Sequence, residues 1–189
     1  MKTAIVTRAL VLTILMLGLG AAGAWAQPKH VRMTFSGTNV ATTINLQPNT
    51  VTDEVHLAGR GSLGPFTFRE LHADGGLAAP PSGCLGPYFG VLKGAGVLQF
   101  LDESLLIVSV VDGSGCVDLA TGTAALIVNY QVNGGTGRFA GASGTLTMKS
   151  TLMPVLANAA NAPALLTNTG RFEGSIVRPA GDDQDEDEQ

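Results

Sequence analysis

The chain has 189 residues, of which 45% are hydrophobic and 14% are charged, and its formal net charge is −4. This length fits one domain with a single core, and the hydrophobic content argues against general disorder. Since the net charge is negative and no basic cluster exists, nucleic acid is excluded as an expected partner. Glycine is abundant, at 25 residues, and helix-type periodicity is scarce, which favours an all-β fold.

Residues 1–26 have the features of a secretory signal peptide. Two basic residues near the start accompany an apolar run over 9–20, and Ala24-Trp25-Ala26 fits the cleavage pattern. The alternative is a membrane anchor, but the run is shorter than the roughly 20 residues that cross a bilayer. We therefore expect cleavage between Ala26 and Gln27. The mature protein is then exported, to the periplasm or outside the cell, with no membrane span.

Residues 179–189 form an acidic tail. The segment 182–188 reads DDQDEDE, whereas residues 27–181 contain equal numbers of acidic and basic side chains. Such a charge run predicts a disordered, solvated tail. Weak calcium binding or docking to a basic partner is the alternative, although the spacing lacks the order of a calcium loop. The folded domain is expected over 27–178.

Alternating apolar and polar residues predict about eight strands in this domain. In the run 30–36, the side chains of Val31, Met33 and Phe35 share one face. Comparable runs occur at 53–59, 65–71, 97–101, 104–111, 121–132, 143–152 and 171–177. This spacing favours a sandwich or a closed antiparallel barrel. The runs 97–101 and 104–111 are apolar on both faces, which suits a barrel covered by another surface, such as a subunit interface.

The segment 154–169 interrupts this rhythm. It is rich in alanine and asparagine and has no charged residue. We expect a long loop with one helical turn between the last two strands, acting as a lid, an interface element or a plain surface insertion.

Cys84 and Cys116 are the two cysteines, and both are expected in glycine- and proline-rich turns. An exported chain matures in an oxidising compartment, so a disulfide between them is predicted. A zinc site would need histidines at suitable spacing, which His30, His56 and His72 do not supply. A nucleophilic cysteine would need a free thiol and a nearby base.

Other motifs are weaker. Residues 59–64 match G-x-G-x-x-G but precede a strand-like segment, so a turn is expected there rather than a dinucleotide site. Residues 112–118, DGSGCVD, look like a cation loop, and turn chemistry is preferred. His56 and His72, with Glu70 near the second, could form a metal pair, but they are expected at the surface or rim. No cofactor, metal or catalytic residue is assigned.

The most informative stretch is GGTGRFAGASGTLT at 134–147. The paired glycines at its start and Gly137 are expected to form a turn with positive φ. Phe139 should anchor the returning chain, and Gly141 and Gly144 should allow a bend or a close approach before the next strand.

This stretch resembles the GGTGxFxxAxG motif of the dirigent proteins, and the chain is similar to bacterial secreted proteins grouped with allene oxide cyclase. The matching positions are Gly134, Gly135, Thr136, Gly137, Phe139, Ala142 and Gly144. The resemblance implies an eight-stranded antiparallel barrel, often oligomeric, with an apolar cavity at one end.

Members of that group cyclise an unstable fatty-acid epoxide or steer the coupling of phenoxy radicals. Their cavity residues lie outside the matched motif, so no catalytic residue is carried over. Strand alternation leaves open whether Glu70 or Glu173 points inward. We expect an exported, non-catalytic barrel that binds a small apolar ligand or a partner, with an enzyme of the dirigent or cyclase kind and a surface-assembly protein, as a homo-oligomer, as the alternatives.

Overall fold

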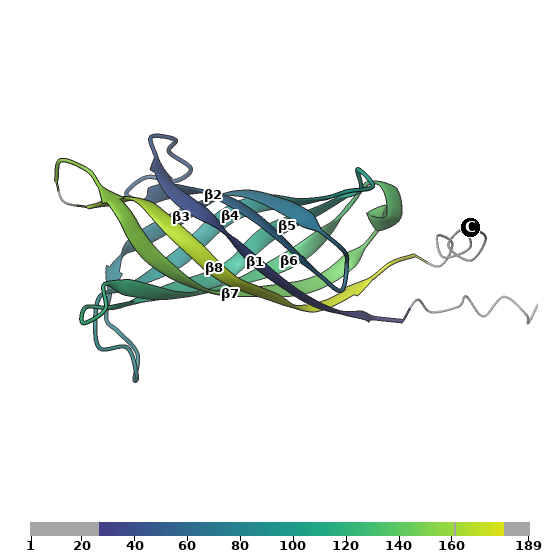
Figure 1. Cartoon of the computed structure of the whole chain (residues 1–189). Helices are drawn as coiled ribbons and strands as arrows, with labels where there is room; N and C mark the ends of the chain where they lie inside the picture. The colour runs from purple at the N-terminus through teal and green to yellow at the C-terminus, as the bar shows by residue number, and fades with distance from the viewer. Residues whose placement is uncertain (1–26, 161, 180–189) are drawn as a thin grey trace, which may run out of the picture.

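The computed structural model describes residues 27–160 and 162–179, and these form one closed antiparallel barrel (Figure 1). Each strand pairs with its sequence neighbours, and β8 closes the barrel by pairing with β1. The strands are β1 (Lys29–Thr42), β2 (Val51–Gly61), β3 (Phe66–Ala78), β4 (Tyr88–Phe100), β5 (Leu105–Asp118), β6 (Thr123–Gly135), β7 (Ser143–Ala157) and β8 (Pro163–Val177). The predicted all-β barrel of about eight strands is confirmed.

Several segments differ from their predictions. The prediction of a loop over 154–169 is wrong, because β7 and β8 continue through this segment as a hairpin. Their ladder extends to the pair of Ala157 and Pro163. The register shifts beside Pro154, which has no N–H to donate to the ladder. Residues 112–118, expected as a turn, lie inside β5.

The predicted signal peptide, 1–26, and residues 180–189 of the acidic tail lie outside the described residues. Among the residues that are described, no helix has the length and hydropathy needed to cross a lipid bilayer.

Aromatic rings fill the half of the barrel in which β1 begins and β8 ends. The ring of Phe172 lies 5.0 Å from that of Phe35, 5.2 Å from Phe68, 6.0 Å from Phe66 and 6.1 Å from Tyr130, measured between centroids. These tilted and edge-to-face pairs are favourable aromatic arrangements. This half is therefore a packed core, as the alternation of apolar residues predicted.

The turn at 134–144 closes the same end of the barrel. It contains the 3₁₀ turn η1 (Gly137–Phe139), and Gly137 has a φ of +56°. Phe139 is buried, with its ring 4.8 Å from that of Phe100. Gly144 has a φ of +138°, and a side chain there would collide with the carbonyl oxygen of Ser175. The glycines thus allow a tight turn that covers the buried ring of Phe139.

The disulfide between Cys84 and Cys116 is confirmed, with the two Cα atoms 5.8 Å apart. Cys84 lies in the connection between β3 and β4. The prediction of a turn around Cys116 is wrong, because this residue lies in β5, where it pairs with Tyr88 of β4 and Ala125 of β6. The bond therefore ties a long surface connection to the barrel wall.

Replacing both cysteines, Cys84→Ser with Cys116→Ser, should lower the free energy of unfolding by roughly 3–4 kcal/mol, because the bond closes a loop with a sequence separation of 32. Urea unfolding of the mature protein measures this. Wild type treated with a reductant should lose the same amount, and a double variant as stable as the oxidised wild type would contradict the prediction.

Phe172→Ala should cost about 3–5 kcal/mol of unfolding free energy, because it leaves a cavity among four aromatic rings. Thr169→Ala, on the outer face of the same strand, should change stability by less than about 0.5 kcal/mol. The same urea titration compares them, and equal losses in both variants would refute the packing argument.

Candidate functional site

The other end of the barrel, where β1 ends and β8 begins, is hollow. The hollow has a volume of about 580 Å³, and its lining includes residues of the β5–β6 and β7–β8 connections. Its walls are mostly apolar and include Leu77, Phe89, Val117, Leu126, Leu152 and Leu166. We call this hollow the mouth. Eight-stranded barrels have an interior that either fills with side chains or leaves room for one small molecule. In this barrel, side chains fill one half and a hollow occupies the other.

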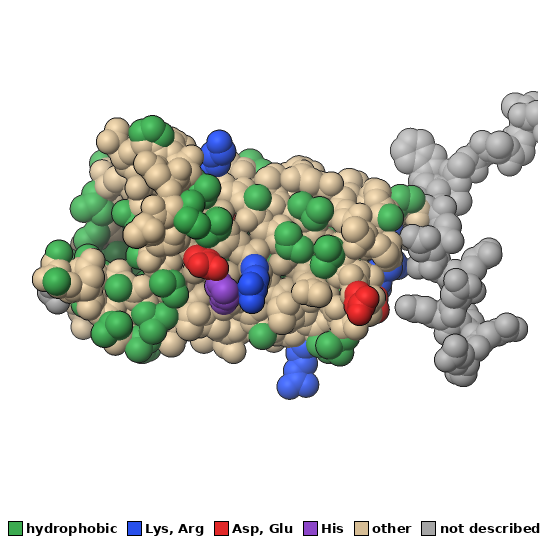
Figure 2. Space-filling view, turned by 90° about the horizontal axis from the view of Figure 1, so that it is seen from above, with side chains coloured by type: hydrophobic (Ala, Val, Ile, Leu, Met, Phe, Trp, Pro, Cys, Tyr) green, Lys and Arg blue, Asp and Glu red, His purple; other side chains and the backbone are tan. Residues whose placement is uncertain are grey.

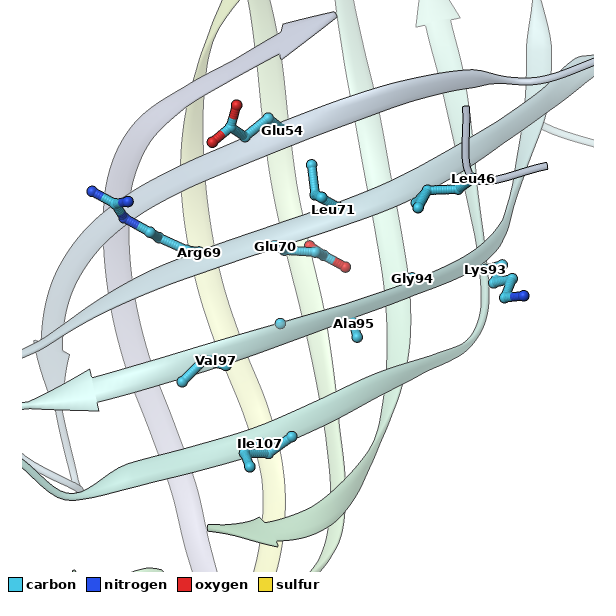
Figure 3. Close-up of a pocket in the computed structure, with 11 residues that line it drawn as sticks. Leu46, Glu54, Arg69, Glu70, Leu71, Lys93, Gly94, Ala95, Val97 and Ile107 are labelled. Carbon is cyan, nitrogen blue, oxygen red and sulfur yellow. The ribbon is translucent and has the colours of Figure 1, made fainter. Parts of the chain in front are cut away.

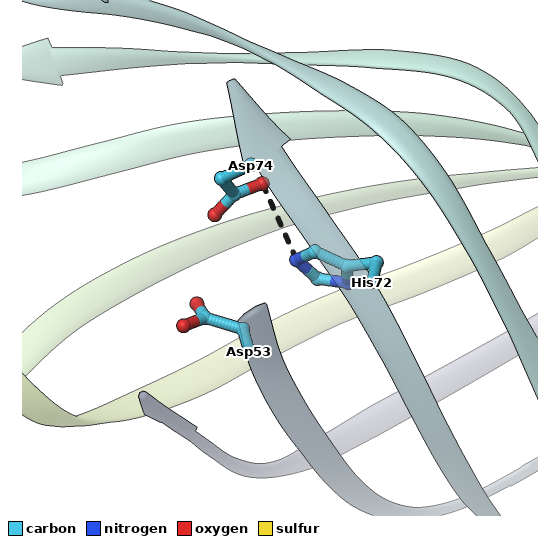
Figure 4. A group of neighbouring side chains, drawn as sticks. All are labelled: Asp53, His72 and Asp74. Atoms are coloured by element: carbon cyan, nitrogen blue, oxygen red, sulfur yellow. Dashed lines mark ion pairs between the residues drawn. The ribbon is translucent and has the colours of Figure 1, made fainter. Parts of the chain in front are cut away.

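Polar side chains form the floor of the mouth. Asp53, His72, Asp74 and Asn39 line it, and we call these four residues the floor. On β3, side chains at alternate positions face inward, which places Glu70, His72 and Asp74 in one row. Asp53 on β2 pairs directly with His72 in the ladder. Figure 4 shows the carboxylates of Asp53 and Asp74 on either side of one edge of the imidazole ring.

His72 lies between two carboxylates. Its Nε2 is 3.5 Å from Asp74 Oδ1, and its Nδ1 is 3.5 Å from Glu70 Oε2. The same Glu70 oxygen accepts a hydrogen bond of 3.0 Å from the Tyr130 hydroxyl. The side chain of His72 is only 1% exposed. A chain of contacts therefore runs from the aromatic core through Tyr130 and Glu70 to the floor.

Two amides complete the buried polar region. Asn168 Nδ2 on β8 donates to Asn39 Oδ1 on β1 at 2.9 Å, and both side chains are fully buried. In this region five buried atoms have no hydrogen-bond partner among the described residues: Asn39 Nδ2, Glu70 Oε1, His72 Nδ1, Asp74 Oδ1 and Asn168 Oδ1. Unpaired buried polar atoms are costly and uncommon. Their concentration beside a hollow makes this region the candidate functional site.

Burial and neighbouring charges shift the pKa values of the acidic and basic side chains at the floor. Burial raises the pKa of Asp53, against the opposing charge of His72. Burial also raises the pKa of Asp74, to about 7, with Asp53 and Glu70 adding to the effect. For His72 burial acts to lower the pKa, but Glu70, Asp74 and Asp53 outweigh it and raise the pKa to about 9. Burial and the nearby Glu70 hold the pKa of Tyr130 well above its usual value, so its hydroxyl remains a donor.

The structure separates residues that the sequence grouped. His56 lies on the outer face, where its Nε2 is 2.6 Å from Glu54 Oε1, as expected for a surface histidine. The same expectation is wrong for His72, which is buried because it shares the inward face of β3 with the phenylalanines. Of the two acids whose direction was open, Glu70 points inward and Glu173 outward, toward Lys149 and Arg171.

A signal for the floor was present in the sequence. Phe66 and Phe68 were expected to share a face, and continuing in steps of two reaches Glu70, His72 and Asp74. The predicted strand ended at residue 71, whereas β3 runs to Ala78. The floor was therefore missed because the strand was predicted to end before His72 and Asp74.

A second hollow, of about 450 Å³, lies on the outer surface over β2 to β5 (Figure 3). Leu46, Leu71, Ala95, Val97 and Ile107 line it, and Glu54, Arg69 and Lys93 stand around them. Figure 2 shows small groups of hydrophobic side chains on the barrel surface. The exposure of Val97 and Ile107 agrees with the two-faced apolar pattern of their strands.

The chain matches no protein-family model, and a comparison with curated proteins also finds no match. The resemblance to the dirigent and allene oxide cyclase group therefore stays a prediction that depends on the motif at 134–147.

Tyr130→Phe should lower the free energy of unfolding by about 1–3 kcal/mol, because it removes the hydrogen bond of 3.0 Å that the buried Glu70 carboxylate accepts from the Tyr130 hydroxyl. Tyr88→Phe is the matched control, since Tyr88 is half-buried and its hydroxyl has no hydrogen bond within the described part of the chain. Chemical unfolding of both variants checks this, and equal stabilities would show that the Tyr130 hydroxyl contributes nothing.

Proposed function

We propose that this protein is an exported barrel that binds one small, mostly apolar molecule in its mouth. The observation that carries the proposal is the hollow of about 580 Å³ with apolar walls and a polar floor. Ligand sites commonly combine such walls, which supply affinity, with a few polar groups that orient the ligand. The disulfide supports an oxidising compartment and hence export.

The charged side chains at the floor determine which polar groups a bound molecule can carry. Three carboxylates, of Asp53, Glu70 and Asp74, surround the single imidazole of His72. Within the described residues, no lysine or arginine lines the mouth. A ligand carboxylate would meet these three acids with only the His72 imidazolium to offset them. The floor therefore favours a molecule with a hydroxyl or an amine over one with an acidic group.

The arrangement of the barrel agrees with a binding pocket rather than a pore. Apart from the polar region at the floor, its interior is apolar, and its outer face carries charged side chains such as Arg69, Lys149 and Arg171. Transmembrane barrels have the opposite alternation. Aromatic rings also block the far end, so the mouth has a single opening for a ligand.

Catalysis is the second candidate, because His72 and Asp74 form an acid–base pair 3.5 Å apart at the base of the hollow. An enzyme resembling the dirigent and cyclase group would confine a reactive molecule there. Native mass spectrometry of protein purified without detergent would identify a bound molecule. Turnover of that molecule by the wild type, absent in Asp74→Asn, would favour catalysis, and its recovery unchanged would favour binding alone.

Ala124→Trp should weaken binding of the neutral fluorophore phenylnaphthylamine at least tenfold, because Ala124 faces the mouth and an indole would fill it. Ala125→Trp, on the outer face of the same strand, should leave binding unchanged. Fluorescence titration of metal-free protein measures both. The anionic relative anilinonaphthalene sulfonate should bind the wild type more weakly than the neutral probe.

Two results would contradict the proposal. One is no binding of the neutral probe to folded wild type. The other is equal loss of binding in both tryptophan variants, which would place the probe outside the mouth.

A further inference from the structure

We propose that Asp53, His72 and Asp74 bind a divalent transition-metal ion of the Zn²⁺ class at the floor of the mouth. One ligand atom from each residue lies within 4.8 Å of the other two. The inference does not rest on the proposed organic ligand, because the ion alone would occupy the site.

The spacing fits one ion. Two ligands at the usual bond lengths of about 2.0–2.2 Å from zinc lie roughly 3–3.5 Å apart. His72 Nε2 and Asp74 Oδ1 already stand at 3.5 Å. The carboxylate of Asp53 flanks the same edge of the imidazole (Figure 4), so a modest side-chain rotation completes a three-residue set.

The surroundings of His72 match those of a metal-binding histidine. Such a histidine usually offers its second ring nitrogen to a carboxylate, which fixes the orientation of the ring. Here Nδ1 faces Glu70 Oε2 at 3.5 Å, and the Tyr130 hydroxyl holds that carboxylate. Nε2 is thereby directed toward the two aspartates.

An unmet polar atom points independently to a ligand. Asp74 Oδ1 is buried and lies 3.5 Å from His72 Nε2, and it has no hydrogen-bond donor among the described residues. Three carboxylates also lie around one imidazole in this buried region. A divalent cation would supply the missing partner of Asp74 and offset the charge of the ionised carboxylates.

The donor set indicates the class of ion. Imidazole nitrogen suits zinc and its neighbours, whereas calcium and magnesium prefer sites built from oxygen alone. The open mouth leaves room for water at the remaining coordination positions, as in zinc sites with three protein ligands.

Calorimetric titration of chelator-treated mature protein with Zn²⁺ tests the site. We expect one site per chain, lost in His72→Gln and weakened at least tenfold in Asp53→Asn and in Asp74→Asn. Glu70→Gln should weaken binding about tenfold or more, through the orientation of His72. The matched control is His56→Gln, which removes an exposed histidine beside a carboxylate and should change nothing. Ca²⁺ should bind the floor more weakly than Zn²⁺.

A second measurement needs no variant at the floor. The chain has three histidines, His30, His56 and His72. Substoichiometric Co²⁺, a paramagnetic substitute for zinc, should perturb the ring signals of His72 in the wild-type NMR spectrum before those of the other two.

The proposal is overturned if His72 is unaffected, if His56→Gln abolishes binding, or if folded His72→Gln retains the site. Probe binding by metal-free protein is a separate result, so the failure of either proposal is distinguishable from that of the other.

Discussion

Closure of the eight-stranded ladder is the constraint on which the rest of this structure depends. Because β8 pairs with β1, alternate residues of every strand must face an interior of limited width. In one half, phenylalanine rings centred on Phe172 occupy that width. In the other half the inward positions carry smaller and polar side chains, which leave the mouth. The same inward-outward alternation therefore produces a packed core where the inward residues are aromatic and a hollow where they are smaller or polar.

The two halves are linked through Tyr130. Its ring packs against Phe68 and Phe172, and its hydroxyl donates to Glu70 at the boundary of the polar region. Glu70 in turn contacts His72, so the rigid aromatic core positions a group at the base of the mouth. Buried carboxylates and an imidazole cost stability compared with apolar residues of similar size. Their placement beside the cavity, and not in the packed half, is the physical reason for seeking the function there.

Much of this architecture follows from local pattern. The alternation at 30–36 predicted correctly that Val31, Met33 and Phe35 share one buried face, and compartment chemistry predicted the disulfide. The strand pattern alone did not distinguish a barrel from a sandwich, because the pairing of β1 with β8 joins segments distant in sequence. The barrel was predicted from the resemblance carried by residues 134–147. The hairpin of β7 and β8 was missed since alanine and asparagine are weak strand formers. The floor was missed because a polar residue at an inward position looks, in sequence, like the end of a strand.

The proposed ion and the proposed ligand meet at the same floor, so each changes what the other encounters. Without metal, the excess of carboxylates favours a ligand with a donor or a positive charge. A bound divalent cation would reverse this preference and attract an oxygen donor, including the carboxylate that the bare floor disfavours. The apolar walls contact the ligand in either case. Occupancy of the floor, and not the shape of the mouth, would then decide which class of apolar molecule the barrel accepts.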